Sequence, residues 1–222
     1  MMVVINRRNR FAWIKLLIFS VFTSFAFTSF GAVAHSASKT VLVLGDSLSA
    51  EYGLARGTGW VALLEQRIQQ NNIPASVINA SISGETTSGG KARLESLLKK
   101  YHPEIVIIEL GGNDALRGLS LRASEKNFRE MIQLSNIAKA KVLLVGMQIP
   151  PNYGKDYTEQ FFSIYARVAK ETKSALVPFL MEGIANKPEL FQTDRIHLLA
   201  TAHPALLENV WPHLQNLLKK IE

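Results

Sequence analysis

The sequence contains no cysteine among its 222 residues. A chain without cysteine forms no disulfide bonds, holds no metal through thiolates and offers no thiol for a lipid anchor. Five histidines are present, but neither H-x-H nor H-E-x-x-H spacing occurs among them, and these spacings are the signatures of zinc sites. We therefore expect no metal in this protein.

A dinucleotide cofactor is also not expected. Gly57, Gly59 and Ala62 imitate a G-x-G-x-x-A fingerprint, but no strand pattern precedes Gly57, and the fingerprint works only in a strand-to-helix turn. The sequence thus predicts a protein that functions without a cofactor.

The chain has little excess charge once its first segment is set aside. The formal net charge is +7, and residues 1–34 contain four basic residues and no acidic one, so the remainder carries about +3 (7 minus 4). Nucleic-acid-binding proteins usually carry a much stronger basic patch. Nucleic acid is therefore not an expected partner.

No apolar run in the sequence is long enough for a comfortable membrane span. Residues 16–30 are apolar and uncharged, but serines and threonines interrupt them and they fall short of the ~20 residues that a span needs. They follow a basic segment with Arg7, Arg8, Arg10 and Lys15, and precede an A-x-A site at Ala32, Val33 and Ala34. We expect residues 1–34 to be a signal peptide, which leaves 188 residues (222 minus 34) as one domain, 35–222. The mature protein is expected in the periplasm or the medium without a stable membrane anchor.

Strand and helix patterns alternate through this domain. Short runs rich in Val, Ile and Leu are typical of buried strands at residues 40–44, 76–79, 105–110, 142–147 and 175–178. Apolar residues recur at helical spacing between the strands, and a last helix is expected over residues 201–219. This order predicts an α/β fold with a five-stranded parallel sheet covered by helices on both faces.

The loops that follow the strands contain the residues expected of a serine hydrolase. A hydroxyl nucleophile needs a base, a group that orients the base, and donors for the oxyanion. Ser47 is the candidate nucleophile, His197 the base and Asp194 the orienting acid. The backbone N–H groups of Ser47 and Gly84, with the side-chain amide of Asn113, are candidates for the oxyanion hole.

Four segments carry a family resemblance. They are "GDSLS" at residues 45–49, Gly84 in "NASISGET", Asn113 in "ELGGNDALRG", and Asp194 with His197. With these blocks in order the chain resembles the SGNH, or GDSL, hydrolases, and within them the periplasmic multifunctional esterases that act as acyl-CoA thioesterase, lysophospholipase and arylesterase. The resemblance implies a three-layer αβα, flavodoxin-like, doubly wound parallel sheet. It implies the same roles for the same five residues, with small acyl esters or thioesters as substrates; we expect a monomer.

Apolar residues near the same strand ends are candidates for contact with an acyl chain. They are Leu116, Leu119, Ile149, Pro150 and Tyr153. Four other polar residues near these loops are expected to be structural: Asp46 and Glu85 as caps of nearby backbone, Asp114 as a residue that holds its loop, and His203 as a surface or capping residue.

One residue departs from the family pattern. Arg195 stands between Asp194 and His197 where the family usually has glycine, and this substitution strains the loop if the position requires a positive φ. One alternative to an esterase is therefore a catalytically impaired binding domain on the same fold, in which Arg195 disables the loop. A second alternative, independent of Arg195, is a carbohydrate deacetylase on this fold.

Overall fold

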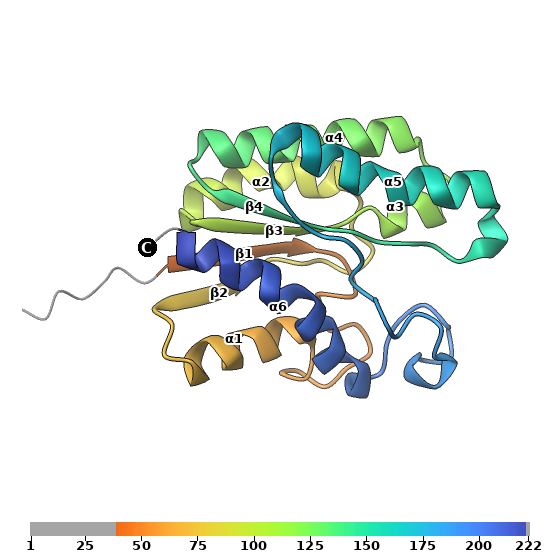
Figure 1. Cartoon of the computed structure of the whole chain (residues 1–222), viewed down its shortest axis with the longest axis horizontal. Helices are drawn as coiled ribbons and strands as arrows, with labels where there is room; N and C mark the ends of the chain where they lie inside the picture. Colours follow the sequence, from red (N-terminus) through yellow and green to blue (C-terminus); the bar gives the residue numbers. More distant parts are fainter. Residues whose placement is uncertain (1–38, 221–222) are drawn as a thin grey trace, which may run out of the picture. The chain divides into compact units, whose positions relative to one another are not determined.

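A five-stranded parallel sheet forms the centre of the protein in our computed structural model, which describes residues 39–220. The predicted signal peptide, residues 1–34, lies outside the described residues. The strand order is β2-β1-β3-β4-β5, the flavodoxin-like order expected from the family resemblance, and every neighbouring pair is parallel (Figure 1). The strands are β1 (Lys39–Gly45), β2 (Ala75–Asn79), β3 (Ile105–Glu109), β4 (Lys141–Val145) and β5 (Ala175–Val177).

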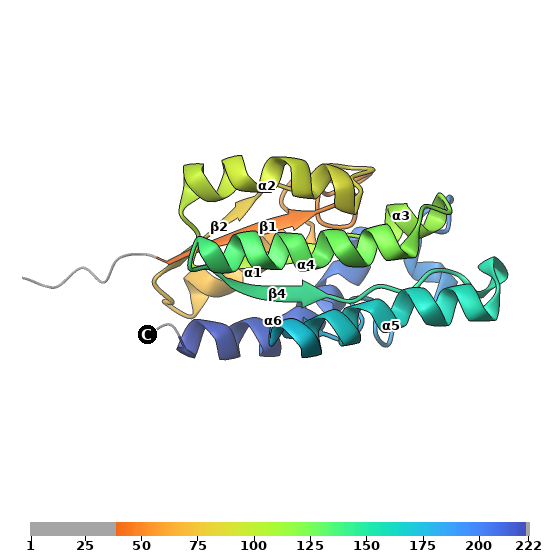
Figure 2. The ribbon, with the colours of Figure 1, turned by 90° about the horizontal axis from the view of Figure 1, so that it is seen from above.

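Helices cover both faces of the sheet and complete the expected three layers. Helices α2, α4 and α5 lie side by side on one face, and α1 and α6 lie on the other (Figures 1 and 2). The helices are α1 (Trp60–Gln70), α2 (Thr87–Tyr101), α3 (Gly112–Leu116), α4 (Leu121–Ile137), α5 (Lys155–Thr172) and α6 (His203–Lys220). Three single 3₁₀ turns are η1 (Pro151–Tyr153), η2 (Pro188–Leu190) and η3 (Ala200–Ala202).

The burial of the central strands explains why their sequences are continuously apolar. Residues 41–44 of β1 and 105–108 of β3 are all fully buried, because helices pack on both faces of these strands. The covering helices are instead apolar on one side, as in α4, where Phe128, Met131 and Ile132 face the sheet layer. Each fully buried side chain of this size contributes roughly 1.5–3 kcal/mol to the free energy of unfolding.

The five predicted strands are confirmed to within about two residues at each end. The last helix, expected from about residue 201, is confirmed to the same precision: residues 200–202 form the 3₁₀ turn η3, and α6 begins at His203. Pro204 follows immediately, at a helix start where a missing N–H costs no intrahelical hydrogen bond.

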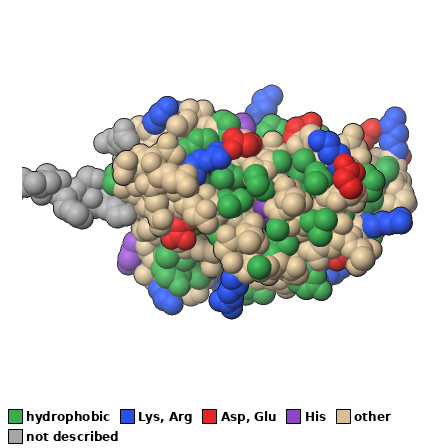
Figure 3. Space-filling model, turned by 90° about the horizontal axis from the view of Figure 1, so that it is seen from below, with side chains coloured by type: hydrophobic (Ala, Val, Ile, Leu, Met, Phe, Trp, Pro, Cys, Tyr) green, Lys and Arg blue, Asp and Glu red, His purple; other side chains and the backbone are tan. Residues whose placement is uncertain are grey.

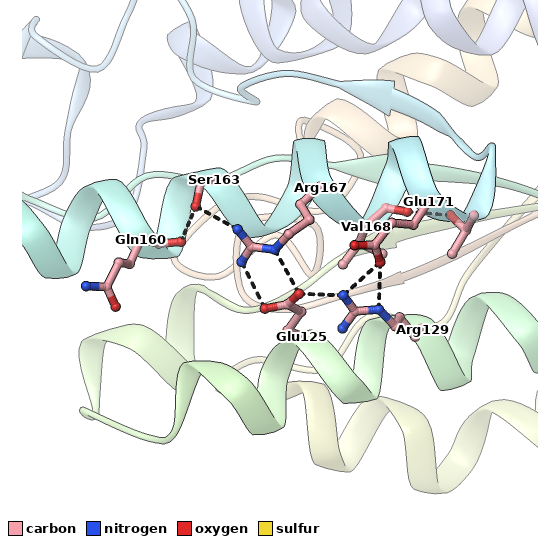
Figure 4. A network of polar contacts seen from close by, with 8 residues as sticks. Glu125, Arg129, Gln160, Ser163, Arg167, Val168 and Glu171 are labelled. Atoms are coloured by element: carbon pink, nitrogen blue, oxygen red, sulfur yellow. Dashed lines mark hydrogen bonds and ion pairs between the residues drawn. The ribbon is translucent and has the colours of Figure 1, made fainter.

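Two helices of one layer are joined by an ionic network on their outer side (Figure 4). Glu125 of α4 accepts two hydrogen bonds from Arg167 of α5, both at 2.9 Å, and also pairs with Arg129. Arg129 in turn reaches Glu171 of α5 at 2.8 Å. Two carboxylates and two guanidinium groups thus alternate across the α4–α5 contact.

The basic side chains do not gather into a patch on the face seen in Figure 3, where they are scattered singly, mostly around the rim. Within residues 39–220, no helix is both long and apolar enough to cross a membrane.

Candidate active site

The loops at the carboxyl ends of the strands form one edge of the molecule, and segment 178–202 lies beyond these ends (Figure 1). The first of these loops turns sharply after β1. A Cβ atom on Gly45 would come within 2.7 Å of Ser49 and 2.9 Å of a carboxylate oxygen of Glu109, so only glycine allows this close approach. The turn places Ser47 at the edge of the sheet.

Ser47, His197 and Asp194 form a continuous row of hydrogen-bonding groups. The Ser47 Oγ lies 2.9 Å from Nε2 of His197, and the His197 Nδ1 lies 2.7 Å from Oδ2 of Asp194. The structure therefore brings together three residues that the sequence places up to 150 positions apart. This is the geometry of a nucleophile, a base and the group that orients the base.

Asp194 is held in its ionised form. Partial burial raises its pKa, but hydrogen bonds from the His197 ring and from the backbone N–H groups of His197 and Ile196 outweigh this effect and lower the pKa to about 2. The carboxylate therefore favours the tautomer in which His197 carries a proton on Nδ1 and leaves Nε2 free to accept one.

The candidate oxyanion donors lie in the neighbouring loops. Gly84 has φ +78°, a conformation that favours glycine. Among the described residues, the backbone N–H groups of Ser47 and Gly84 donate to no protein atom. The Asn113 side-chain amide donates one hydrogen bond, to Asp46 Oδ2 at 3.1 Å, and its second N–H can serve a substrate oxygen.

Arg117 is a residue of this site that the sequence interpretation missed. Its guanidinium donates to the Gly84 carbonyl at 3.0 Å and to the Asn113 side-chain carbonyl at 3.4 Å. It thus connects the two loops that supply candidate oxyanion donors. The family segment "LRG" contains this arginine, but no local pattern in the sequence indicates which loop it reaches.

Two buried carboxyl groups, Asp46 and Glu109, lie under the candidate site. Glu109 ends β3 and accepts hydrogen bonds from the Ser49 hydroxyl at 2.7 Å and the Asp46 N–H at 3.3 Å. Burial and the nearby Asp46 charge raise its pKa well above the ordinary value, which favours the neutral form of this carboxyl. Burial also raises the pKa of Asp46, to about 6, against the opposing effect of hydrogen bonds from Leu48 and Asn113. Glu109 is the one acidic residue in the otherwise apolar run 105–110, and this is the feature of the sequence that could have indicated a buried carboxyl group here.

The residues expected to be structural occupy such positions. Asp46 accepts the Leu48 N–H at 3.1 Å and so caps its turn. Asp114 is buried and accepts hydrogen bonds from Thr87 of α2 and Ser124 of α4, which holds the Asn113 loop against two helices. Glu85 accepts the Thr86 N–H at 3.2 Å.

His203 is buried rather than on the surface, and its Nδ1 accepts the first N–H of α1, from Trp60, at 3.0 Å.

Two further residues position the histidine loop and were not foreseen. The Tyr52 ring lies against the His197 ring with 4.3 Å between centroids. The Gln192 side-chain amide donates to the carbonyls of Tyr52 at 3.1 Å and Leu198 at 3.0 Å. The loop after β1 is therefore tied to the loop that carries Asp194 and His197.

A cavity of about 530 Å³ opens beside Ser47 and His197. Three of the residues predicted to contact substrate line it, namely Leu116, Ile149 and Pro150. The other two, Leu119 and Tyr153, are not among its lining residues, and both are exposed. Their contact with substrate therefore stays a prediction, and Tyr153 still lies close to the cavity, since its hydroxyl donates to the carbonyl of Leu116 at 3.3 Å. Further apolar side chains that the sequence did not indicate complete the wall: Leu48, Met147, Phe179, Met181 and Phe191.

Comparison with known sequences identifies the family. The sequence model of the GDSL-like Lipase/Acylhydrolase family matches residues 43–205, a span that contains Ser47, Gly84, Asn113, Asp194 and His197. The chain belongs to this family. The resemblance inferred from the four sequence blocks is thereby confirmed.

The relatives of this GDSL-like hydrolase extend over most of its length. Esterase TesA of Pseudomonas aeruginosa is 49% identical over 184 residues, which cover 83% of this chain and 92% of that protein. Thioesterase 1/protease 1/lysophospholipase L1 of Escherichia coli (strain K12) is 40% identical over 214 residues, covering 96% and 98%. The crystal structure of TesA matches with a TM-score of 0.79 at 49% identity, covering 81% of this chain and 99% of that chain.

The described part of this GDSL-like hydrolase holds no group of three or more His, Cys, Asp or Glu side chains arranged to bind a metal ion.

Proposed function

We propose that this GDSL-like hydrolase cleaves acyl esters and thioesters through an acyl-serine intermediate on Ser47. The observation that carries the proposal is the row Ser47 Oγ, His197 Nε2 and Nδ1, Asp194 Oδ2, with separations of 2.9 and 2.7 Å. The relatives' names, esterase and thioesterase/lysophospholipase, support the same two bond classes.

The first step is attack of the Ser47 Oγ on the acyl carbon. His197 Nε2 takes the hydroxyl proton as the Oγ–C bond forms, and Asp194 stabilises the positive charge on the ring. When the tetrahedral intermediate collapses, the bond to the leaving oxygen or sulfur breaks and His197 returns the proton to that atom. A water molecule then repeats the sequence on the acyl-serine and releases the acid.

The negative charge that develops on the carbonyl oxygen is stabilised by the N–H groups of Ser47 and Gly84 and by the Asn113 amide. These donors are held before substrate arrives, the amide by Asp46 and Arg117 and the Gly84 loop by Arg117. Donors already in place cost no reorganisation during the reaction.

The cavity supports an acyl group as the part of the substrate that it binds. Its wall is built mainly from Leu, Ile, Met, Pro and Phe side chains, which lower the free energy of an alkyl chain relative to water. A carbohydrate deacetylase needs a polar groove for sugar hydroxyls, and this wall does not supply one. We therefore retain the esterase over the deacetylase.

The decisive experiment measures hydrolysis of p-nitrophenyl esters of graded chain length by Ser47→Ala, His197→Ala and the double variant. Each single variant should lose activity by a factor of at least ~10³, and the double variant should be little worse, because the residues act as one unit. Ser163→Ala changes a surface serine of α5 and serves as the matched control.

Near wild-type turnover by Ser47→Ala with an unchanged melting temperature would show that the nucleophile is assigned wrongly. A wild-type protein that binds acyl ligands but hydrolyses none of the esters would instead be the impaired binding domain.

We further propose that the protein is exported, with residues 1–34 removed, and that it works as a monomer. The basic segment, the apolar run and the A-x-A site support export, and the site needs no residue from a second chain. Intact-mass measurement and light scattering on material from the periplasm test both statements; a mass that includes residues 1–34 would contradict removal.

A further inference from the structure

Arg195 is the one arginine or lysine among the residues that line the cavity. It is exposed, and its backbone N–H donates to the Gln192 carbonyl at 2.9 Å. Its guanidinium forms no hydrogen bond or ion pair with any described residue. An arginine side chain normally pairs with carboxylates or phosphates where these are in reach, so this cation is available to a ligand.

The carboxylates nearest in sequence and in the cavity are already occupied. Asp194 uses Oδ2 for the His197 ring and Oδ1 for the N–H groups of Ile196 and His197. Asp46 is buried and accepts hydrogen bonds from Leu48 and Asn113. Neither forms an ion pair with Arg195, so the positive charge at the cavity wall is not neutralised by a salt bridge.

The backbone of Arg195 adds a second observation. Its φ of +58° lies in the left-handed region, as the sequence departure from glycine had raised as a possibility. Five other described non-glycine residues share a positive φ, so the conformation alone does not mark a function. This backbone conformation places the Cβ atom of Arg195 on the same tight turn that carries His197.

The position of His197 determines which part of a substrate meets Arg195. The leaving atom must come within hydrogen-bond distance of His197 Nε2 to receive its proton. Arg195 and His197 both line the cavity and are two residues apart. We therefore assign the part of the wall that holds Arg195 to the leaving group and the apolar part of the wall to the acyl chain.

We propose that Arg195 selects acyl substrates whose leaving group carries a phosphate a few bonds from the scissile ester, as in an acyl glycerophosphate. This inference rests on the proposed function, because the leaving-group side is defined by Ser47 and His197. In an acyl glycerophosphate a single glycerol unit separates the ester from the phosphate, a distance that an arginine side chain can span. In an acyl-CoA thioester the pantetheine arm holds the phosphates much farther away.

The test compares two substrates that differ only in the phosphate: a 1-acylglycerol and the corresponding 1-acylglycerol 3-phosphate, with acyl chains short enough to stay monomeric. We measure the ratio of kcat/KM for the phosphate ester to that for the neutral ester. Arg195→Gln and Arg195→Gly should lower this ratio roughly three- to tenfold at low salt, and less at high salt. Arg195→Lys keeps the charge and should retain most of the ratio.

Two control variants separate this effect from charge and backbone changes elsewhere. Lys219→Gln removes one positive charge near the end of α6, and Lys173→Gly relieves a φ of +56° at the end of α5. Both should leave the ratio unchanged. A drop of equal size for acyl-CoA in Arg195→Gln would overturn the proposed contact, because it would show long-range attraction rather than binding beside the ester.

The same assay separates this inference from the proposed function. An unchanged ratio in Arg195→Gln, with both activities abolished by Ser47→Ala, overturns only the role of Arg195. Hydrolysis of both substrates that survives Ser47→Ala overturns the proposed function and, with it, the side assigned to the leaving group.

Discussion

Arg117 is a positioning residue, because it acts on the candidate oxyanion donors rather than on the reacting atoms. One guanidinium nitrogen accounts for both contacts, to the Gly84 carbonyl and to the Asn113 side chain. A displacement of about 1 Å in such donors costs as much as ~10²-fold in rate. The spacing of the two loops therefore depends on a side chain that is itself exposed to solvent.

We expect Arg117→Ala to lower kcat about tenfold with little change in KM, since oxyanion donors act chiefly in the transition state. Asn113→Ala should cost more, ~10²- to 10³-fold, because it removes a donor outright. The double variant should be worse than Asn113→Ala alone by less than the tenfold cost of Arg117→Ala, because only the effect of Arg117 on the Gly84 loop remains to be lost.

Arg122→Ala is the matched control, since it removes an exposed arginine of α4 outside the cavity lining. A purely structural Arg117 would behave differently: its loss would lower the melting temperature and raise KM, with kcat per folded molecule retained.

At the scale of elements, the α4–α5 contact depends on the ionisation of Glu125. Hydrogen bonds from Arg167, followed by those from Arg129, outweigh partial burial and lower the pKa of this carboxyl to about 2 from the ordinary 4.5. A carboxyl with a lowered folded-state pKa stabilises the protein at pH values above 4.5, and this stabilisation is lost as the pH falls toward 2.

Glu125→Gln should therefore lower the free energy of unfolding by roughly 1 kcal/mol at pH 7, a figure reduced for solvent screening. The difference between variant and wild type should shrink as the pH falls from about 4.5 toward 2. Thermal unfolding followed by circular dichroism at a series of pH values measures both effects.

Glu159→Gln provides the comparison for Glu125→Gln. Among residues 39–220 this glutamate of α5 pairs only with Lys155, at 3.8 Å, and both side chains are exposed, so the change should have little effect at any pH. A constant difference between wild type and Glu125→Gln across the pH range would show that the glutamate stabilises by packing rather than by charge.

At the scale of the whole molecule, the sequence predicts those strands and loops whose conformation follows from a local pattern of residues. Central parallel strands are mostly apolar, so the pattern of residues 105–110 predicted a buried strand. The abrupt end of this run at Gly111 and Gly112 indicated the edge of the sheet where Asn113 lies. Family blocks assigned the candidate roles of Ser47, Gly84, Asp194 and His197, and the structure brings Ser47, Asp194 and His197 into hydrogen-bonding distance.

Contacts between distant, exposed segments follow no such rule. The ring contact between Tyr52 and His197 and the hydrogen bond from Gln192 to the Tyr52 carbonyl each join residues about 140 positions apart. Neither Tyr52 nor Gln192 belongs to a periodic pattern in the sequence. The exposure of Leu119 and Tyr153 could not be predicted for a related reason, since an apolar side chain in a turn can face solvent as readily as a cavity.

The molecule should lose activity on heating before it loses its sheet. Asp194 and His197 lie on a loop held by the Phe191–Leu198 bridge and by the Gln192 N–H to His197 carbonyl bond of 2.7 Å. Residues 193–196 in this loop are exposed, and segments with few buried contacts open at a lower free energy than the core. Initial rates measured at rising temperature should fall several degrees below the midpoint of the circular dichroism transition.

Gln192→Ala should widen this gap, because it removes the two hydrogen bonds that tie the loop to Tyr52 and Leu198. Coincident midpoints for activity and ellipticity in both proteins would show that the loop unfolds only together with the sheet.

The raised pKa of the buried Glu109 affects the pH dependence of unfolding. Because its pKa is raised in the folded protein, this carboxyl keeps its proton up to a higher pH than it does in the unfolded chain, where the pKa is near 4.5. Unfolding therefore releases a proton to the buffer, and the free energy of unfolding decreases as the pH rises above 4.5. Calorimetric unfolding enthalpies measured at a series of pH values above 4.5 should then include the heat of protonating the buffer, so that two buffers with different ionisation enthalpies give different apparent enthalpies, and Glu109→Gln should reduce that difference.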